Sequence, residues 1–137
     1  MTHFKILDIS GDVGLHIYGA TDEELFHNAA QGLFSLITEP SHIVQTEERK
    51  VMVASEDDEG MLIKWLNELI FLFDAYGFVG KKFALSFKGQ QLNAVIAGGI
   101  FDQSRDECRL LIKAATYHNL ILKKDSSGYE ARVMFDI

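Results

Sequence analysis

The sequence has 137 residues, which is enough for one domain with a sizeable core and too few for two comfortable cores. Its 13 basic and 20 acidic side chains give a formal net charge of −7, and this balance argues against a protein that wraps a long nucleic-acid backbone, which requires many Lys and Arg contacts to phosphate. The single cysteine excludes an internal disulfide and any zinc site built from several cysteines. We therefore expect a single domain over residues 1–137.

The charge is distributed unevenly along the chain. Residues 1–78 carry 4 basic and 14 acidic side chains, whereas residues 79–137 carry 9 basic and 6 acidic ones. The acidic part suits cations or basic partners. The second part contains the lysine pairs Lys81-Lys82 and Lys123-Lys124, whose simplest role is solubility.

No segment predicts a membrane span or a secretory leader. The longest apolar-rich window, Met61–Phe73, is short and contains Lys64, Asn67 and Glu68. The first residues, Met1–Lys5, lack a signal-peptide pattern. A lone thiol is typical of a reducing compartment, so we expect a cytoplasmic protein with no membrane partner.

One helix is predicted to begin at Thr21 and to stop before Pro40. Thr21 and Glu24 have capping-box spacing: the Thr hydroxyl can accept from the Glu24 amide, and the Glu24 carboxylate can accept from the Thr21 amide. Apolar residues then recur at helical spacing as far as Ile37.

A second helix is predicted from near Ser55 to a stop at Gly77. Four consecutive acidic residues, Glu56–Glu59, fall in its expected first turn, where carboxylates favour the positive end of the helix dipole. Its apolar residues are too many for one stripe, so we expect this helix to be covered on more than one side. The aromatic residues around it are expected to pack in the core rather than to stack on bases; they are Trp65, Phe71, Phe73, Tyr76 and Phe78.

The rest of the chain reads as strands. Alternation predicts strands near Val13–Tyr18, Phe83–Lys88 and Tyr129–Ile137, and apolar runs predict two more over Leu92–Phe101 and Leu110–Leu122. With a further strand between the two helices, the coarse order is β–α–β–α–β–β–β–β. This order predicts an α+β fold: a two-layer sandwich in which two helices cover one face of a mainly antiparallel sheet.

The sequence contains no nucleophile motif such as Gly-x-Ser-x-Gly and no phosphate-binding glycine loop. Cys108 lies among charged residues, and an incidental thiol is the simpler interpretation. The five histidines show no His-x-x-x-His spacing; His16 and His118 fall in predicted strands, where hydrogen bonding or exposure is the usual role. Catalytic residues are therefore not predicted.

The carboxylates near the two ends of the sequence are more informative. Asp8 and Asp12 flank the turn Ile9–Gly11, and Asp136 is followed by Ile137. Carboxylates packed together must protonate, stay solvated or hold a cation, and oxygen ligands without sulfur favour Ca²⁺ or Mg²⁺. The residues alone leave open the simpler alternative that Asp8 caps a turn and Asp136 is solvated.

Lys113 is a lone lysine in an apolar segment, Leu110–Ala115. It can pair with a carboxylate, contact a phosphate or simply face solvent.

Five segments together resemble the archease family, in order and over nearly the whole chain. Asp8–Gly14 resembles the family's Asp-His-Thr-Ala-Asp-Ile/Val-Gly turn, and Thr21–Ala30 resembles its Thr-x-Glu-Glu-Leu-Phe-x-Asn-Ala-Ala helix. The others are Leu62–Ile70, similar to Leu-x-x-Trp-Leu-Asn-Glu-Leu; Ile112–His118, similar to Ile-Lys-Ala-x-Thr-Tyr-His; and Arg132–Ile137, similar to a terminal Asp followed by one aliphatic residue.

This resemblance implies a function that composition does not. Archeases are accessory proteins of the tRNA-splicing RNA ligase that joins 3′-phosphate or 2′,3′-cyclic phosphate ends to 5′-hydroxyl ends. They promote guanylylation of the ligase's catalytic histidine and multiple turnover, so the ligase is the implied protein partner and RNA is contacted only indirectly. The implied divalent-cation site, usually assigned to calcium, uses Asp12, Asp136 and a main-chain or terminal oxygen of Ile137.

The sequence departs from the family pattern at one turn. Ile9 replaces the family histidine, and Ser10-Gly11 replaces Thr-Ala, so a proton-transfer role for that histidine does not carry over. Asp8 and Lys113 match family positions and are expected to contact the partner.

Two other functions remain compatible with the residues. The first is a small metal-dependent phosphoester hydrolase that uses the same carboxylates with Lys113 or His118. The second is a chaperone or modulator of RNA- or DNA-processing proteins, acting through the basic second part of the chain.

Overall fold

The computed structural model describes residues 3–137, which form seven strands, two α-helices and one short 3₁₀ helix. The elements are β1 (Phe4–Ile9), β2 (Asp12–Gly19), α1 (Asp22–Ile37), η1 (Pro40–His42), β3 (Glu47–Ala54), α2 (Asp58–Tyr76), β4 (Phe78–Lys88), β5 (Gln91–Ile100), β6 (Ala114–Asp125) and β7 (Gly128–Asp136).

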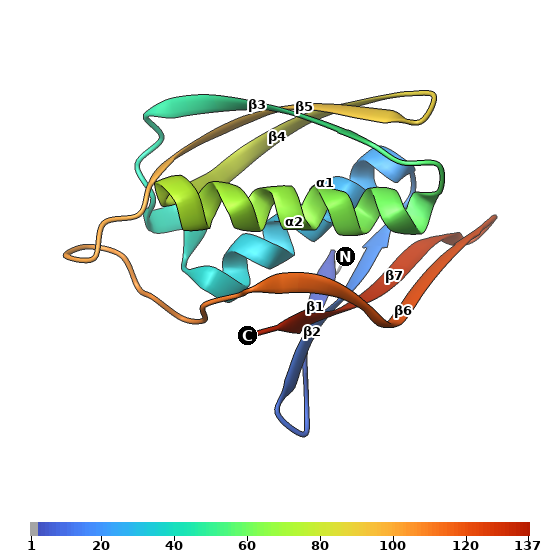
Figure 1. The fold of residues 1–137 in the computed structure, drawn as a ribbon, viewed down its shortest axis with the longest axis horizontal. Helices are drawn as coiled ribbons and strands as arrows, with labels where there is room; N and C mark the ends of the chain where they lie inside the picture. The colour runs from blue at the N-terminus through green and yellow to red at the C-terminus, as the bar shows by residue number, and fades with distance from the viewer. Residues whose placement is uncertain (1–2) are drawn as a thin grey trace.

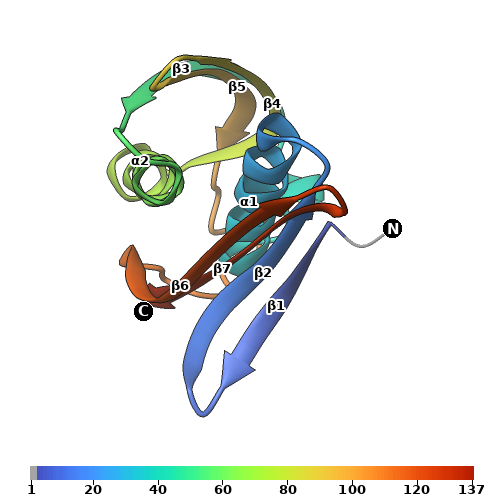
Figure 2. The ribbon, with the colours of Figure 1, turned by 90° about the vertical axis from the view of Figure 1, so that its right-hand side faces the viewer.

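The strands form two antiparallel sheets, with the helices between them (Figures 1 and 2). One sheet has four strands in the order β1-β2-β7-β6, and the other has three in the order β3-β5-β4. The α+β class and the sandwich are confirmed. The division into two sheets was not predicted from the sequence, which suggested a single sheet with both helices on one face. Both helices contact both sheets, so α2 is covered on more than one side, as its composition predicts.

The helix ends follow the capping chemistry, with small differences from the prediction. The Thr21 hydroxyl accepts from the Glu24 amide at 3.1 Å, but the Glu24 carboxylate accepts from Ala20 rather than from Thr21. Helix α2 begins at Asp58, later than expected, because Asp57 is the cap and its carboxylate accepts from the Gly60 amide at 2.6 Å. Gly77 ends α2 in the left-handed conformation, with φ of 69°.

Two strand boundaries also differ from the prediction. A strand missing from the sequence-based order, β1, pairs with β2 through a two-residue turn in which Ser10 and Gly11 have φ of 52° and 87°. Two positive φ values give the primed turn that matches the twist of a hairpin. Strand β6 begins at Ala114 rather than Leu110, and the preceding residues 101–113 form a loop.

The core lies between the helices and the inner faces of the two sheets. Trp65 is completely buried, and its indole nitrogen donates to the Phe26 carbonyl of α1 at 3.0 Å, which ties the two helices together. Of the aromatic residues expected in the core, Phe78 is buried, but Phe71 and Tyr76 are 51 % and 53 % exposed, because they lie on the solvent side of α2. No helix of residues 3–137 is long and apolar enough to span a membrane.

The loop of residues 101–113 is held by charged groups. The buried Asp106 carboxylate accepts from the Arg105 guanidinium at 2.8 and 3.0 Å and from the Asp102 amide at 2.8 Å. The Arg109 guanidinium donates to the carbonyls of Ser35 and Thr38 at the end of α1. These contacts fix the path of the chain into β6.

Trp65→Phe is expected to lower the free energy of unfolding by about 1–3 kcal/mol, because it removes the bond to Phe26 and leaves a void. Urea denaturation followed by circular dichroism measures the change. Phe71→Leu on the exposed side of the same helix is the control, and about 0.5 kcal/mol or less is expected for it. Equal losses in both variants would contradict the central role of Trp65.

The Arg105 side-chain hydrogen bond lowers the pKa of Asp106 below the ordinary aspartate value. The stability that Asp106 adds is therefore complete above the ordinary pKa and is lost as the pH falls through the lowered pKa of the folded state. The protection factor of the Asp102 amide, which is the ratio of its intrinsic to its observed hydrogen-exchange rate, should fall over that acidic range in the wild type. In Asp106→Asn, exchange should already be fast at neutral pH. Asp74→Asn, an exposed change at the end of α2, should behave as the wild type. Fast exchange of the Asp102 amide in this control at neutral pH would refute the role assigned to Asp106.

Candidate functional site

Asp12 and Asp136 lie at the same end of the four-stranded sheet, although they are far apart in the sequence. Strands β2 and β7 are antiparallel neighbours, and Val13 pairs with Phe135. Asp12 and Asp136 are the next residues outward on their strands. Side chains alternate along a strand, so both carboxylates are on the face opposite to the buried Val13 and Phe135, and both residues are exposed. We call this solvent-facing side the outer face of the four-stranded sheet.

Lys113 and Ile137 lie at this same end. The Lys113 amide donates to the Asp136 carbonyl at 2.8 Å, directly before β6 begins. Ile137 follows Asp136, and it and Lys113 are both exposed. The fold therefore brings four of the five predicted site residues to one edge.

Asp8 is the residue that the fold separates from the others. It pairs with Val13 across the β1–β2 hairpin, so its side chain is on the opposite face from Asp12. The two residues do flank the predicted turn, and Figure 2 shows this hairpin projecting beyond the rest of the sheet. Asp8 is exposed there and is not a neighbour of the Asp12–Asp136 pair on the outer face.

The donor set at this edge is carboxylate and main-chain oxygen, which suits a hard divalent cation. Within residues 3–137, neither the Asp12 nor the Asp136 side chain makes an ion pair or hydrogen bond with another protein group. No group of three His, Cys, Asp or Glu side chains able to hold a metal occurs in that range. The residues present therefore fit a cation only with a further oxygen, such as one from Ile137.

A pocket of about 350 Å³ adjoins Asp12 on the outer face. It is lined by Arg132 and Asn119, which are not among the predicted site residues, and by His118, for which hydrogen bonding or exposure is predicted. Arg132 belongs to the alternating pattern of β7, where a polar side chain is expected on the solvent face, so no local signal distinguishes it.

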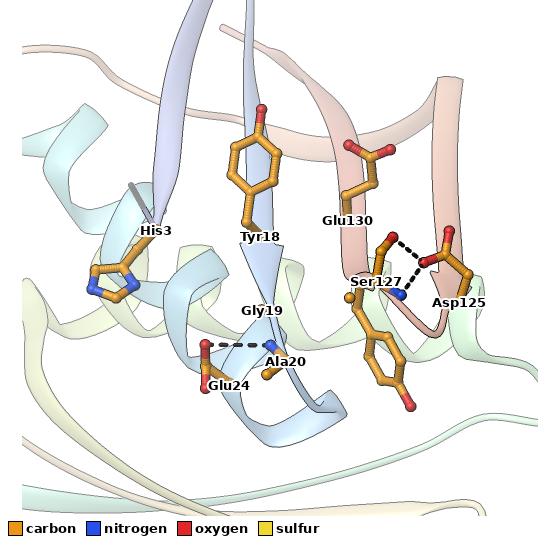
Figure 3. Close-up of a pocket in the computed structure, with 10 residues that line it drawn as sticks. His3, Tyr18, Gly19, Ala20, Glu24, Asp125, Ser127 and Glu130 are labelled. Carbon is orange, nitrogen blue, oxygen red and sulfur yellow. Dashed lines mark hydrogen bonds between the residues drawn. The ribbon is translucent and has the colours of Figure 1, made fainter. Parts of the chain in front are cut away.

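A larger pocket, about 670 Å³, lies at the opposite end of β2 from Asp12 and is shown in Figure 3. Its carboxylates already have partners: Glu24 accepts from the Ala20 amide, and Asp125 accepts from the amide and hydroxyl of Ser127. These two hydrogen bonds from Ser127 lower the pKa of Asp125. The polar groups of this pocket thus stabilise local turns.

Glu130 on the rim of that pocket is occupied as well. Its carboxylate lies 2.9 Å from the His16 ring nitrogen Nε2, and the Tyr18 hydroxyl lies 3.2 Å from His16 Nδ1. His16 therefore has the hydrogen-bonded role expected of a lone strand histidine.

The remaining candidate residues have structural roles or are exposed. Lys124 bridges Asp22 and Asp58, and Lys81 donates to the Ile43 carbonyl. Cys108 is exposed in the loop of residues 101–113. None of these three contributes to the Asp12–Asp136 edge.

The sequence matches the model of the archease protein family over residues 4–137. A curated protein archease from Saccharolobus solfataricus is 34 % identical, with 100 % of each chain covered. Another from Methanosarcina mazei is 32 % identical over 98 % of this chain and 95 % of its own.

Solved structures agree with these sequence matches. The solution structure of Methanobacterium thermoautotrophicum protein 1598 has a TM-score of 0.84 and 32 % identity, with both chains fully covered. A crystal structure from Thermotoga maritima, described as an archease and possible chaperone, has a TM-score of 0.70 and 25 % identity over 97 % of this chain and 96 % of its own. With a family match over nearly its whole length, relatives above 30 % identity and this shared fold, the chain belongs to the archease family.

Proposed function

We propose that this protein is a non-catalytic activator of the tRNA-splicing RNA ligase, promoting guanylylation of the ligase's catalytic histidine and multiple turnover. The family membership supports this proposal, and the observation that carries it is the β2–β7 register, which brings Asp12 and Asp136 to one exposed edge. The protein partner is the ligase, and RNA is contacted indirectly, in the cytoplasm.

The proposed edge holds a divalent cation, Ca²⁺ or Mg²⁺, between the carboxylates of Asp12 and Asp136 and an oxygen of Ile137. When bound, such an ion supplies positive charge that offsets carboxylate repulsion and can orient phosphate oxygens. The strand pairing fixes the spacing of the two carboxylates, and the Lys113 amide holds the Asp136 main chain beside them. The protein's residues therefore preorganise the edge before a cation arrives.

The same edge is the proposed docking surface for the ligase. Lys113 is exposed beside Asp136 and can contact a carboxylate or phosphate of the partner. Asp8 is exposed on the other face of the projecting hairpin, so it would contact a different part of the ligase from the cation. Docking in this way would present the cation at the ligase's nucleotide site, where phosphoryl transfer is assisted by charge and orientation.

Two competing functions make different predictions. A metal-dependent phosphoester hydrolase would turn over substrate as the isolated chain with Mg²⁺, using Asp12 and Asp136 with Lys113 or His118. A chaperone or modulator of RNA- or DNA-processing proteins, a role in keeping with the description of the Thermotoga maritima relative as a possible chaperone, would protect several clients and would not need the cation.

Asp12→Asn and Asp136→Asn are each expected to weaken Ca²⁺ binding at least about tenfold, because affinity at an oxygen site depends on ligand charge. Isothermal titration calorimetry with CaCl₂ measures the effect. Asp8→Asn is the matched control, since it removes one carboxylate from the opposite face and should leave Ca²⁺ affinity unchanged. If Ca²⁺ affinity falls equally in all three variants, binding depends on the net charge of the protein and not on these two carboxylates. The proposed cation site would then be rejected.

Ligase turnover tests the function itself. With RNA in large excess over ligase, addition of the wild-type protein should raise the yield from about one product per ligase to many. Asp12→Asn and Asp136→Asn should abolish this rise. Glu48→Gln, an equal charge change on the exposed side of β3, should preserve it. If the wild-type protein leaves ligase turnover unchanged, the proposed activator function is refuted.

A further inference from the structure

The pocket of about 350 Å³ beside Asp12 combines hydrogen-bond donors with an apolar floor. It is lined by residues of β1, β2, β6 and β7 on the outer face of the four-stranded sheet: Ile9, Asp12, His118, Asn119, Leu120, Ile121, Arg132 and Met134. Arg132, His118 and Asn119 supply nitrogen groups, and Asp12 is the only carboxylate among the lining residues. The pocket is therefore suited to an anion at the Arg132 end.

Arg132 enters this pocket without an internal partner. Its Nε is buried and has no hydrogen-bond acceptor within residues 3–137, and no carboxylate of that range lies within ion-pair distance of its guanidinium. Its cross-strand neighbour His16 is already bonded to Glu130. The two terminal nitrogens of the guanidinium also make no hydrogen bond within residues 3–137, and unlike Nε they are accessible, so a bound oxyanion can accept from both.

An irregularity in β6 shapes one wall of the pocket. Thr116 pairs with Met134 and Ile121 pairs with Arg132, so the four residues 117–120 stand opposite the single residue Val133. Asn119 takes the left-handed conformation there, with φ of 54°, and its amide lies 3.2 Å from the His118 ring. A bulge of this kind redirects side chains, and it brings His118 and Asn119 to the same pocket as Arg132.

The floor of the pocket lies between Arg132 and the carboxylate edge. Gly14 and Met134 form the intervening cross-strand pair, and a side chain on Gly14 would collide with the Met134 sulfur. Glycine at this position lets the Met134 side chain lie flat over β2, and Met134 forms the apolar floor between Arg132 at one end and Asp12 at the other. A ligand in this pocket would lie between the Arg132 guanidinium and the cation proposed at Asp12.

We infer that this pocket binds a phosphate monoester through Arg132, His118 and Asn119. A phosphate group has enough oxygens to accept from the guanidinium fork and to face a neighbouring hard cation at the same time, which a carboxylate achieves less well. The binding of the phosphate at Arg132 stands on the pocket alone. Its strengthening by a divalent ion rests on the proposed cation site, because the Asp12 carboxylate opposes an anion until a cation neutralises it.

The test uses adenosine 5′-monophosphate as the probe and adenosine as its matched ligand without phosphate. Amide chemical shifts of the isotope-labelled full chain are followed in both titrations, with and without CaCl₂. We expect the monophosphate to shift residues of β2, β7 and 117–121, and adenosine to leave them unchanged. CaCl₂ should raise the affinity for the monophosphate several-fold.

Arg132→Gln should weaken monophosphate binding about tenfold or more, and Arg132→Lys, which keeps the charge but loses the fork, should weaken it less. Lys123→Gln, an equal charge change at an exposed position of the same sheet, should bind as the wild type. Equal binding of adenosine, equal loss in Lys123→Gln or undiminished binding by Arg132→Gln would overturn the inference. Calorimetry with CaCl₂ alone judges the cation site separately, so monophosphate binding without Ca²⁺ affinity would reject that site and retain the pocket.

Discussion

The antiparallel pairing of β2 with β7 joins residues 12–19 to residues 128–136 in the middle of the four-stranded sheet. The meeting of Asp12 and Asp136 depends on the register of this pairing. It aligns the inner residues Val13, Leu15 and Ile17 with Phe135, Val133 and Ala131, and burial of these pairs under α1 resists a slip of one residue. The same register places Asp12 on β2 beside Asp136 on β7, with both side chains on the outer face of the sheet. The burial that stabilises the sheet thus also holds the carboxylates of Asp12 and Asp136 at one edge.

The edge formed by Asp12 and Asp136 holds two like charges close together, so it favours the binding of cationic groups from outside the chain. Two exposed carboxylates at one end of a sheet repel, and no cationic side chain of residues 3–137 pairs with either of them. Elsewhere the protein does pair its carboxylates, as Asp106 with Arg105 and Asp22 with Lys124 show. Arg132, on the same face, has no carboxylate of residues 3–137 within ion-pair distance. Unpaired charges of both signs at one edge are typical of a surface that completes its interactions with something outside the chain.

The packing behind this edge explains how it stays rigid. Helix α1 lies on β2, and helix α2 lies on β6, so both strands that border β7 have a helix behind them. Asn67 of α2 accepts from the Ala115 amide at 2.8 Å and donates to its carbonyl, which ties the start of β6 to the helix. Asn67 lies in the segment that resembles the family's helix motif, and its role here is to position the chain next to Lys113. A surface that presents a fixed set of charges depends on this kind of support from the elements behind it.

The sequence by itself determined the local features: the Thr21 cap, the glycine at the end of α2, the covered apolar faces of α2, the carboxylates suited to a hard cation, and the family. The caps and the helix faces depend on residues within a few positions of one another, whose preferences are set by hydrogen bonding and side-chain periodicity. The carboxylates and the family are recognised from short motifs, each of them local. The tertiary structure decided that the strands divide into two sheets, that Asp8 turns away from Asp12, and that a bulge in β6 brings His118 and Asn119 to Arg132. The division into sheets depends on which strands pair, including β2 with β7, which are more than a hundred residues apart in the chain. The orientation of Asp8 and the bulge depend on the register within the β1–β2 and β6–β7 hairpins, where one step exchanges the two faces.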